Sequence, residues 1–196
     1  RVILDGVFNH TGSNSRYFNA EGYYPEPGAA QSQNSEYYNW YSFHPWPSDY
    51  DAWWGVKTLP AVNEAQPAYR DFIFGDQDSV VRHWLRCGAD GWRLDVADEL
   101  PGDFIEGIRS AIDAEKPGAY LLGEDWEDGS NKIAYSRRRR YLLGRETHGL
   151  MNYPLRTATL DYIRGGSAAA FRETMEEQRE NYPPAAFYSG LNILGT

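Results

Sequence analysis

Apolar and polar positions along the 196 residues alternate between short strand-like runs and longer helix-like periods. Residues 91–96 predict a strand, because Trp92, Leu94 and Val96 alternate with polar positions. The same reading predicts strands at 2–8 (buried), 120–123, 148–153 and 187–194, and helices at 67–87, 103–112, 131–143, 155–163 and 168–181. Strands that alternate with helices are typical of parallel βαβ units, so the pattern predicts an α/β fold.

The segment 11–66 does not follow this alternation. It is rich in Gly, Pro, Asn, Ser and aromatic residues and has no sustained helical period. Irregular segments of this length in compact domains are usually functional, so we predict an inserted irregular subdomain that lies over a site. At least one of its aromatic side chains is expected to line a cleft: Trp40, Tyr41, Trp46, Trp53 or Trp54.

Arg93 and Asp95 are predicted to share the strand face opposite the apolar residues. An arginine is always charged and can fix a carboxylate through a forked hydrogen bond. The nearby positive charge is expected to lower the pKa of Asp95 and keep it ionised, which makes Asp95 a candidate nucleophile. The alternative is a salt bridge at a strand end that only stabilises the fold.

Two other predicted strands also end in polar side chains. Glu124 is followed two residues later by Trp126, and a carboxyl group against an indole is expected to have a raised pKa and to donate a proton. Residues 5–10 suggest a ligand-facing His10 with Asp5 and Asn9 in structural roles. The alternatives are a solvent-facing glutamate and ordinary turn chemistry.

The charge balance disfavours a nucleic-acid partner. Asp and Glu number 28 against 19 Lys and Arg, a net charge of −9, and the only basic run, residues 137–140, is interpreted as a solvated helix face. Aromatic residues reach 15%, which suits flat hydroxylated ligands but also a protein core. No apolar run approaches membrane-spanning length. The single cysteine, Cys87, excludes an internal disulfide and favours a reducing, cytoplasmic compartment.

Four ordered motifs resemble the α-amylase family of retaining glycoside hydrolases and transglycosylases: DGVFNH (5–10), LPAVN (59–63), GWRLDVADE (91–99) and GEDW (123–126). MNYP (151–154) is most similar to the neopullulanase and cyclomaltodextrinase branch, although 59–63 departs at three of five positions from that branch's Met-Pro-Lys-Leu-Asn motif. The resemblance implies a (β/α)8 TIM barrel. Residues 1–196 would form a partial catalytic domain, about strands three to seven, with the subdomain 11–66 inserted after its first strand.

The resemblance also implies residue roles. Asp95 would be the nucleophile and Glu124 the acid and base, while Arg93 would orient and ionise Asp95. The residues assigned to substrate contacts are His10, Arg93, Asp5, Asn63, Trp126 and Glu99. No cofactor is required and no metal ligand is assigned; Asn9 matches a calcium-binding position of many relatives, which the suggested branch often lacks, so calcium stays an open alternative.

The implied activity is hydrolysis of α-1,4 glucosidic bonds, with α-1,6 bonds open, in maltooligosaccharides, cyclodextrins, pullulan or starch. The alternatives are a transglycosylase or branching enzyme and a non-catalytic glucan-binding remnant, and a homodimer is also open. The family's third carboxylate would follow Thr196, and strands one, two and eight are not recognised in the chain. The 196-residue polypeptide is therefore expected to be inactive by itself.

Overall fold

The computed structural model describes residues 1–193, which divide into two compact units. The first unit takes residues 1–6 and those from 81 onward, and the second takes 7–80. Each unit is considered by itself below. Within residues 1–193, no helix has both the length and the apolar character that crossing a membrane requires.

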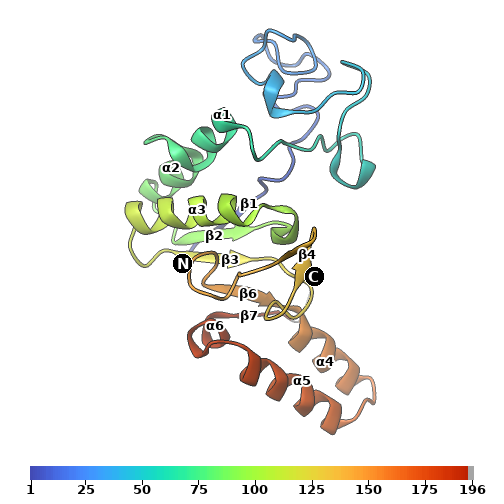
Figure 1. The fold of residues 1–196 in the computed structure, drawn as a ribbon, viewed down its shortest axis with the longest axis vertical. Coiled ribbons are helices and arrows are strands. Elements are labelled where there is room, and N and C mark those ends of the chain that lie inside the picture. The colour runs from blue at the N-terminus through green and yellow to red at the C-terminus, as the bar shows by residue number, and fades with distance from the viewer. Residues whose placement is uncertain (194–196) are drawn as a thin grey trace. The chain divides into compact units, whose positions relative to one another are not determined.

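The first unit is built on a parallel five-stranded sheet in the order β1-β2-β3-β6-β7 (Figure 1). Its strands are β1 (Ile3–Gly6), β2 (Gly91–Leu94), β3 (Tyr120–Gly123), β6 (Gly149–Asn152) and β7 (Leu191–Asn192). Every neighbouring pair is parallel, as the alternation of strands and helices predicted. The carboxyl ends of parallel strands meet at one edge of a sheet, and this edge receives four of the polar residues singled out in the sequence: Asp5, Arg93, Asp95 and Glu124.

Apolar packing in the first unit is concentrated around β2, β3 and α3 (Gly102–Glu115). Five side chains of α3 are buried: Phe104, Ile105, Ile108, Ala111 and Ile112. They share the interior with Leu94 and Leu121, which are both 0% exposed. Removal of this much apolar surface from water is the main stabilising contribution to the unit.

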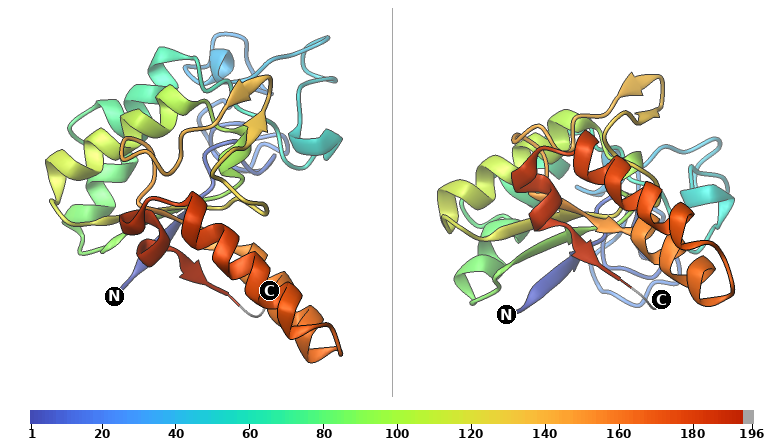
Figure 2. Two further views of the ribbon diagram at one scale, coloured as in Figure 1. Left: turned by 60° about the horizontal axis from the view of Figure 1, so that its bottom comes forward. Right: turned by 90° about the horizontal axis from the view of Figure 1, so that it is seen from below.

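Helices α4 (Tyr153–Ile163) and α5 (Ala168–Asn181) form an antiparallel hairpin and pack chiefly on each other (Figure 2). α4 has no buried residue, and the one buried residue of α5 is polar, Gln178. The amide of Asn152 holds the hairpin: its Oδ1 accepts the Leu155 N–H at 3.0 Å and a Gln178 side-chain N–H at 3.0 Å.

The helix predicted over 67–87 is interrupted. α1 (Pro67–Arg70) passes into a π-helix over Asp71–Gly75, and α2 (Val80–Arg86) starts only after a turn. The Asp76 N–H bonds to the carbonyl of Asp71, and the Ser79 N–H bonds to Asp76. Residues 75–79, Gly-Asp-Gln-Asp-Ser, favour turns over helix interiors, which explains the break.

The prediction of a helix over 131–143 is wrong. Residues 133–138 form a hairpin of β4 (Ile133–Ala134) and β5 (Arg137–Arg138). Tyr135 and Ser136 connect the strands with φ of 52° and 61°, and two left-handed residues in succession are the geometry of a tight two-residue hairpin turn.

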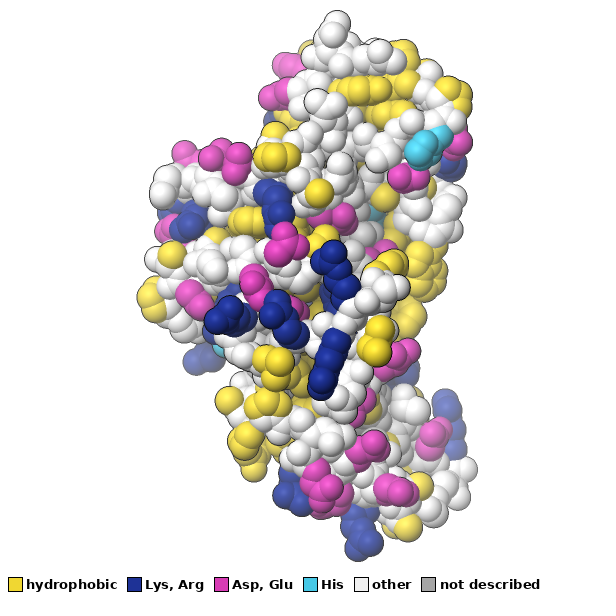
Figure 3. All heavy atoms as spheres, in the orientation of Figure 1, with side chains coloured by type: hydrophobic (Ala, Val, Ile, Leu, Met, Phe, Trp, Pro, Cys, Tyr) yellow, Lys and Arg dark blue, Asp and Glu magenta, His cyan; other side chains and the backbone are white. Residues whose placement is uncertain are grey.

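The interpretation of residues 137–140 as a solvated helix face is wrong as well. Arg137, Arg138 and Arg140 are exposed, and Figure 3 shows basic side chains gathered over α3 and the β4–β5 hairpin. Arg139, however, is buried and donates hydrogen bonds to the carbonyls of Ala97 and Leu100 at 2.7 and 2.6 Å. Its guanidinium therefore satisfies backbone groups in the interior.

Two strand predictions need correction. The run over 2–8 forms a strand only at Ile3–Gly6. This strand is not buried as predicted: Val2 is 58% and Ile3 42% exposed, because β1 pairs with β2 alone among the described strands. Of the strand predicted over 187–194, residues up to Ser189 belong to helix α6 (Pro184–Ser189), and only β7 is extended. Residue 194 lies outside the described residues.

The second unit contains no strand longer than an isolated bridge in residues 11–66, and its helical turns there are the 3₁₀ turns Tyr38–Trp40 and Trp53–Gly55. Aromatic rings provide its core: Phe18, Trp40, Tyr41 and Tyr69 are each at most 5% exposed. Of the five aromatic residues singled out above, Trp40 and Tyr41 are thus core residues, whereas Trp54 is 68% exposed. That one of the five lines a cleft, and that 11–66 is an inserted subdomain, stay predictions.

Candidate active site

Three neighbouring strands deliver charged side chains to one edge of the sheet. Asp5 of β1 stands in register with Arg93 of β2, Asp95 follows the end of β2, and Glu124 follows the end of β3. Because the strands are parallel and adjacent, residues 88 and 31 positions apart in sequence become neighbours.

The guanidinium of Arg93 joins these carboxylates. Its Nη1 lies 2.7 Å from Asp5 Oδ1 and 2.7 Å from Asp95 Oδ1, and its Nη2 lies 2.8 Å from Glu124 Oε1. Both the Asp95 and the Glu124 oxygens contact one planar group, so they lie well within the roughly 9.5 Å that bounds paired glycosidase carboxyls. The side chains of Arg93, Asp95 and Glu124 are 19%, 21% and 9% exposed, which limits screening of these three charges by water, whereas Asp5 is 58% exposed.

The chain turns sharply after β2, before the end of the strand predicted over 91–96. β2 ends at Leu94, and Val96 has φ 39° and ψ 53°, a left-handed conformation that costs a β-branched residue about 1–3 kcal/mol. The turn points the Val96 N–H at Glu124 Oε2, 3.0 Å away, and the Ala97 N–H at the Glu124 carbonyl, 3.1 Å away. The strained turn thereby fixes the Glu124 carboxyl relative to Asp95.

The expectation that Trp126 raises the pKa of Glu124 is wrong. Burial by itself raises this pKa, but hydrogen bonds from the Val96 N–H and the Trp126 indole, the Arg93 charge and the Tyr153 hydroxyl together hold it below its usual value. Trp126 presents the edge of its ring, with Nε1 donating to Glu124 Oε1 at 3.1 Å, instead of an apolar face. A donor stabilises the ionised carboxylate.

The expectation for the pKa of Asp95 is also reversed. Burial raises the pKa of Asp95 by more than the Arg93 hydrogen bond and charge lower it, and the nearby Glu124 and Asp5 carboxylates add to the rise. Burial is the main cause of the rise, and Arg93 does not offset it because its one guanidinium is shared among three carboxylates.

The remaining candidates fall in both units. In the first unit, Glu99 ends the 3₁₀ turn Ala97–Glu99. In the second unit, His10 is 8% exposed, stacks on Trp53 with centroids 5.0 Å apart, and has Nδ1 3.3 Å from Asn9 Oδ1. Asn63 there accepts the Ala65 N–H through its side chain. Substrate contacts of these residues stay predictions.

The calcium alternative is likewise untested. The Asn9 amide donates to Glu64 Oε1 at 3.2 Å. Within residues 1–193 there is no group of three or more His, Cys, Asp or Glu residues arranged to hold a metal ion. The part of the chain that the structure describes thus offers no strong donor set for calcium, and Asn9 as a ligand stays a prediction.

Sequence reasoning missed Tyr153, whose hydroxyl donates to Glu124 Oε1 at 3.1 Å. The signal was present, since Tyr153 lies at the end of the predicted strand 148–153 and so at the same edge of the sheet as Glu124. It also missed Lys132, which contacts Asp125 Oδ1 at 2.6 Å and was assigned to a helix that does not exist.

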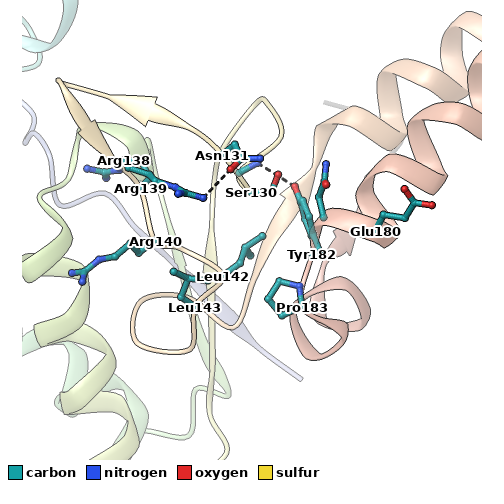
Figure 4. A pocket seen from close by; sticks show the side chains of 12 residues that line it. Ser130, Asn131, Arg138, Arg139, Arg140, Leu142, Leu143, Glu180, Tyr182 and Pro183 are labelled. Carbon is teal, nitrogen blue, oxygen red and sulfur yellow. Dashed lines mark hydrogen bonds between the residues drawn. The ribbon is translucent and has the colours of Figure 1, made fainter.

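A separate pocket of about 350 Å³ lies between the connection after β3 and the end of α5 (Figure 4). Arg138 donates to Asn131 Oδ1 at 2.8 Å on one side of it, and the Gly129 N–H bonds to the Tyr182 hydroxyl at 3.2 Å on the other. Neither Asp95 nor Glu124 lines this pocket.

Comparison with known proteins places these residues in context. The family described as "Alpha amylase, catalytic domain" matches residues 1–186. An amylopullulanase from Thermoanaerobacterium saccharolyticum is 35% identical over 227 residues that cover 100% of this chain and 17% of the relative. A cyclomaltodextrinase from Geobacillus thermopakistaniensis is 32% identical over 205 residues, again covering 100% of this chain and 32% of the relative.

Solved structures are similar over the whole chain. A cyclic alpha-maltosyl-(1→6)-maltose hydrolase from Arthrobacter globiformis superposes with a TM-score of 0.82 at 27% identity, covering 100% of this chain and 42% of that one. A debranching enzyme from Nostoc punctiforme gives a TM-score of 0.77 at 28% identity, with the same coverage of 100% and 42%. These neighbours imply a (β/α)8 barrel fold, and the chain spans less than half the length of each of these four proteins. On the family match and these likenesses, the chain belongs to the alpha-amylase catalytic-domain family of glycoside hydrolases.

Proposed function

We propose that this chain is part of the (β/α)8 catalytic domain of a retaining glycosidase that cleaves α-1,4 glucosidic bonds, with α-1,6 bonds as the open alternative, and that Asp95 is the nucleophile and Glu124 the acid and base. The observation that carries the proposal is the pair of carboxyls, Asp95 and Glu124, bound to one guanidinium at the carboxyl ends of adjacent strands. Retaining enzymes hold two such carboxyls roughly 5–5.5 Å apart.

Double displacement assigns each carboxyl one task in each step. In the first step Asp95 attacks the anomeric carbon while protonated Glu124 transfers its proton to the departing glycosidic oxygen, which leaves a covalent glycosyl ester. In the second step ionised Glu124 takes a proton from water, the water oxygen bonds to the anomeric carbon, and the Asp95 carboxylate leaves. Arg93 limits the motion of both carboxyls, and such positioning contributes several kcal/mol to catalysis.

The pKa directions give the first step a specific requirement. Asp95 must be ionised and Glu124 protonated, whereas the structure raises the pKa of Asp95 and lowers that of Glu124. Both shifts therefore disfavour, in the free enzyme, the protonation state that the first step requires. A neutral sugar that excludes water from Glu124 would raise its pKa and increase the reactive fraction.

An α-glucan is the proposed substrate. Amylopullulanases, cyclomaltodextrinases and a hydrolase solved with maltose are among the proteins this chain is similar to. The second unit offers a surface suited to sugar rings: Trp54 stacks on Trp53 with centroids 5.0 Å apart, and Trp53 stacks on His10 at the same distance. Trp54 is 68% exposed and held at φ 50°, a strained conformation that fixes its ring at the surface.

The extent of the barrel is also part of the proposal. The sheet of the first unit has β1 and β7 as its outer strands, each paired on one side only among residues 1–193. Structural neighbours are more than twice as long, so further strands would close the barrel in the complete catalytic domain. We place this chain at about strands three to seven.

Substitution of Glu124 tests the central assignment in the complete catalytic domain. Glu124→Gln should slow hydrolysis of maltooligosaccharides by at least about 10²-fold, since general acid catalysis contributes that much. Activated aryl glycosides should slow less, because their leaving groups need little protonation. Asp95→Ala should abolish turnover of both and leave glucan binding measurable. Equal slowing of both substrate classes by Glu124→Gln would contradict the assignment of Glu124.

Tyr153→Phe tests the pKa of Glu124. The hydroxyl at 3.1 Å stabilises the ionised carboxylate, so its removal should raise the pKa of Glu124 and keep the acid protonated to higher pH. The alkaline limb of the kcat/KM profile should move to higher pH, because one hydrogen bond to the ionised carboxylate is lost. Tyr162→Phe, at an exposed tyrosine of the same helix, is the matched control. An unmoved or acid-shifted limb would contradict the prediction.

Trp54→Ala tests the aromatic surface. Loss of a stacking face should weaken binding of maltoheptaose to the Asp95→Ala protein about 3- to 10-fold, as measured by titration calorimetry. Trp84→Ala is the control, since Trp84 is 48% exposed but has no tryptophan stacked beneath it among the described contacts. Equal affinity of the Trp54 variant and the parent would remove Trp54 from the binding surface.

The 196-residue polypeptide by itself should show no turnover. Unpaired outer strands hold Asp95 and Glu124 less rigidly, and about 1 Å of misplacement can cost ~10²-fold in rate. An assay on maltooligosaccharides and cyclodextrins, with the Asp95→Ala polypeptide as control, measures this. Turnover comparable to that of an intact relative and absent from the control would refute the prediction.

A further inference from the structure

Three carboxylates, those of Asp98, Asp125 and Glu127, contact the ammonium group of Lys132 and are called the acidic cluster below. The Nζ of Lys132 contacts Asp125 Oδ1 at 2.6 Å, Glu127 Oε2 at 3.3 Å and Asp98 Oδ2. Lys132 is only 10% exposed and Asp125 is 0% exposed. Lysine is rarely buried to this degree unless it is paired, so the opposite charges offset the free-energy cost of burying one another.

The ammonium connects the two turns that carry the candidate catalytic residues. Asp98 lies in the turn Ala97–Glu99, three residues after Asp95, and Asp125 directly follows Glu124. The Ala97 N–H bonds to the Glu124 carbonyl, the Val96 N–H bonds to the Glu124 carboxylate, and Arg93 bridges Asp95 and Glu124. Lys132 adds a further charged connection, on Asp98 and Asp125.

Neighbouring groups fix the positions of the carboxylates in the acidic cluster. Tyr141 donates to Asp98 Oδ1 at 2.6 Å and is itself contacted by Arg139 Nε at 2.7 Å. Asp125 Oδ1 also accepts the Glu127 N–H at 3.1 Å. With Asp98 fixed from behind by Tyr141 and Asp125 fixed by its own turn, the position of Lys132 sets the spacing between the two turns.

We propose that Lys132 is a positioning residue. Its ammonium binds the acidic cluster of Asp98, Asp125 and Glu127 and thereby holds the turn after Asp95 against the turn after Glu124. This inference rests on the proposed function of Asp95 and Glu124. Its chemical consequence is that the acidic cluster, once the lysine side chain is removed, is a site for a small ammonium ion, because three carboxylate oxygens that paired with the Lys132 ammonium then lack their partner.

The test is cation rescue in the complete catalytic domain. Lys132→Ala should lower kcat on maltooligosaccharides by about 10²-fold with KM changed less than about threefold, since positioning of the carboxyls is lost while sugar contacts remain. Propylammonium chloride should restore at least about tenfold of that kcat in a saturable way and leave the parent protein unaffected. Lys57→Ala, at a lysine 51% exposed and paired with Asp49, is the control and should not respond to propylammonium.

A second variant separates positioning from folding. Lys132→Met combined with Asp125→Leu replaces the charged pair by apolar groups, which commonly preserves or raises stability. If Lys132 only stabilises the fold, this protein regains the parent kcat; if Lys132 positions the turns, kcat stays low although the thermal midpoint is restored. A parent-like kcat in the double variant, or in Lys132→Ala without added cation, would overturn the proposal.

Failure of the Lys132 proposal can be distinguished from failure of the proposed function. Loss of activity in Asp95→Ala together with normal kcat in Lys132→Ala would refute only the role of Lys132. Full activity in Asp95→Ala would refute the catalytic assignment itself.

Discussion

One guanidinium organises the charged edge of this sheet. Arg93 alone balances Asp5, Asp95 and Glu124, which come from three different strands. The arrangement depends on parallel register, because only adjacent strands that end together bring all three carboxylates within reach of one side chain. Because the positive charge is shared, burial prevails at Asp95 and raises its pKa, whereas at Glu124 the hydrogen-bond donors together with the Arg93 charge outweigh burial and lower its pKa.

The connection after β3 performs a related task through buried charges. Arg139 donates to two carbonyls of the turn after β2, and Lys132 joins the same turn to the residue that follows Glu124. Buried ion pairs are weak sources of stability because desolvation offsets most of their attraction. Their value here is geometric, since each fixes the distance between loops that no regular secondary structure connects.

The sequence was sufficient where structure is local. Period-two alternation located β2, the strand predicted over 120–123 matches β3, and the helix predicted over 168–181 matches α5. It failed where partners are distant in sequence: the hairpin at 133–138 depends on two left-handed residues, and Arg139 is buried because carbonyls some 40 residues away accept its hydrogen bonds. The predicted direction of the Glu124 pKa shift was wrong for the same reason, because the Val96 N–H and the Tyr153 hydroxyl reach Glu124 only in the folded chain.

The α4–α5 hairpin has a consequence for how the chain opens. Its two helices bury no apolar side chain, and polar contacts of the Asn152 amide and of the Tyr153 hydroxyl attach them to the sheet. Free energies of local opening follow the buried apolar contacts that must be broken, so residues 153–181 form a unit of low local stability beside a core centred on α3 and β3. Amide hydrogens of this hairpin would exchange with solvent through sub-global opening, long before those of Leu121 and Leu122, and a protease would reach it while the sheet stays intact.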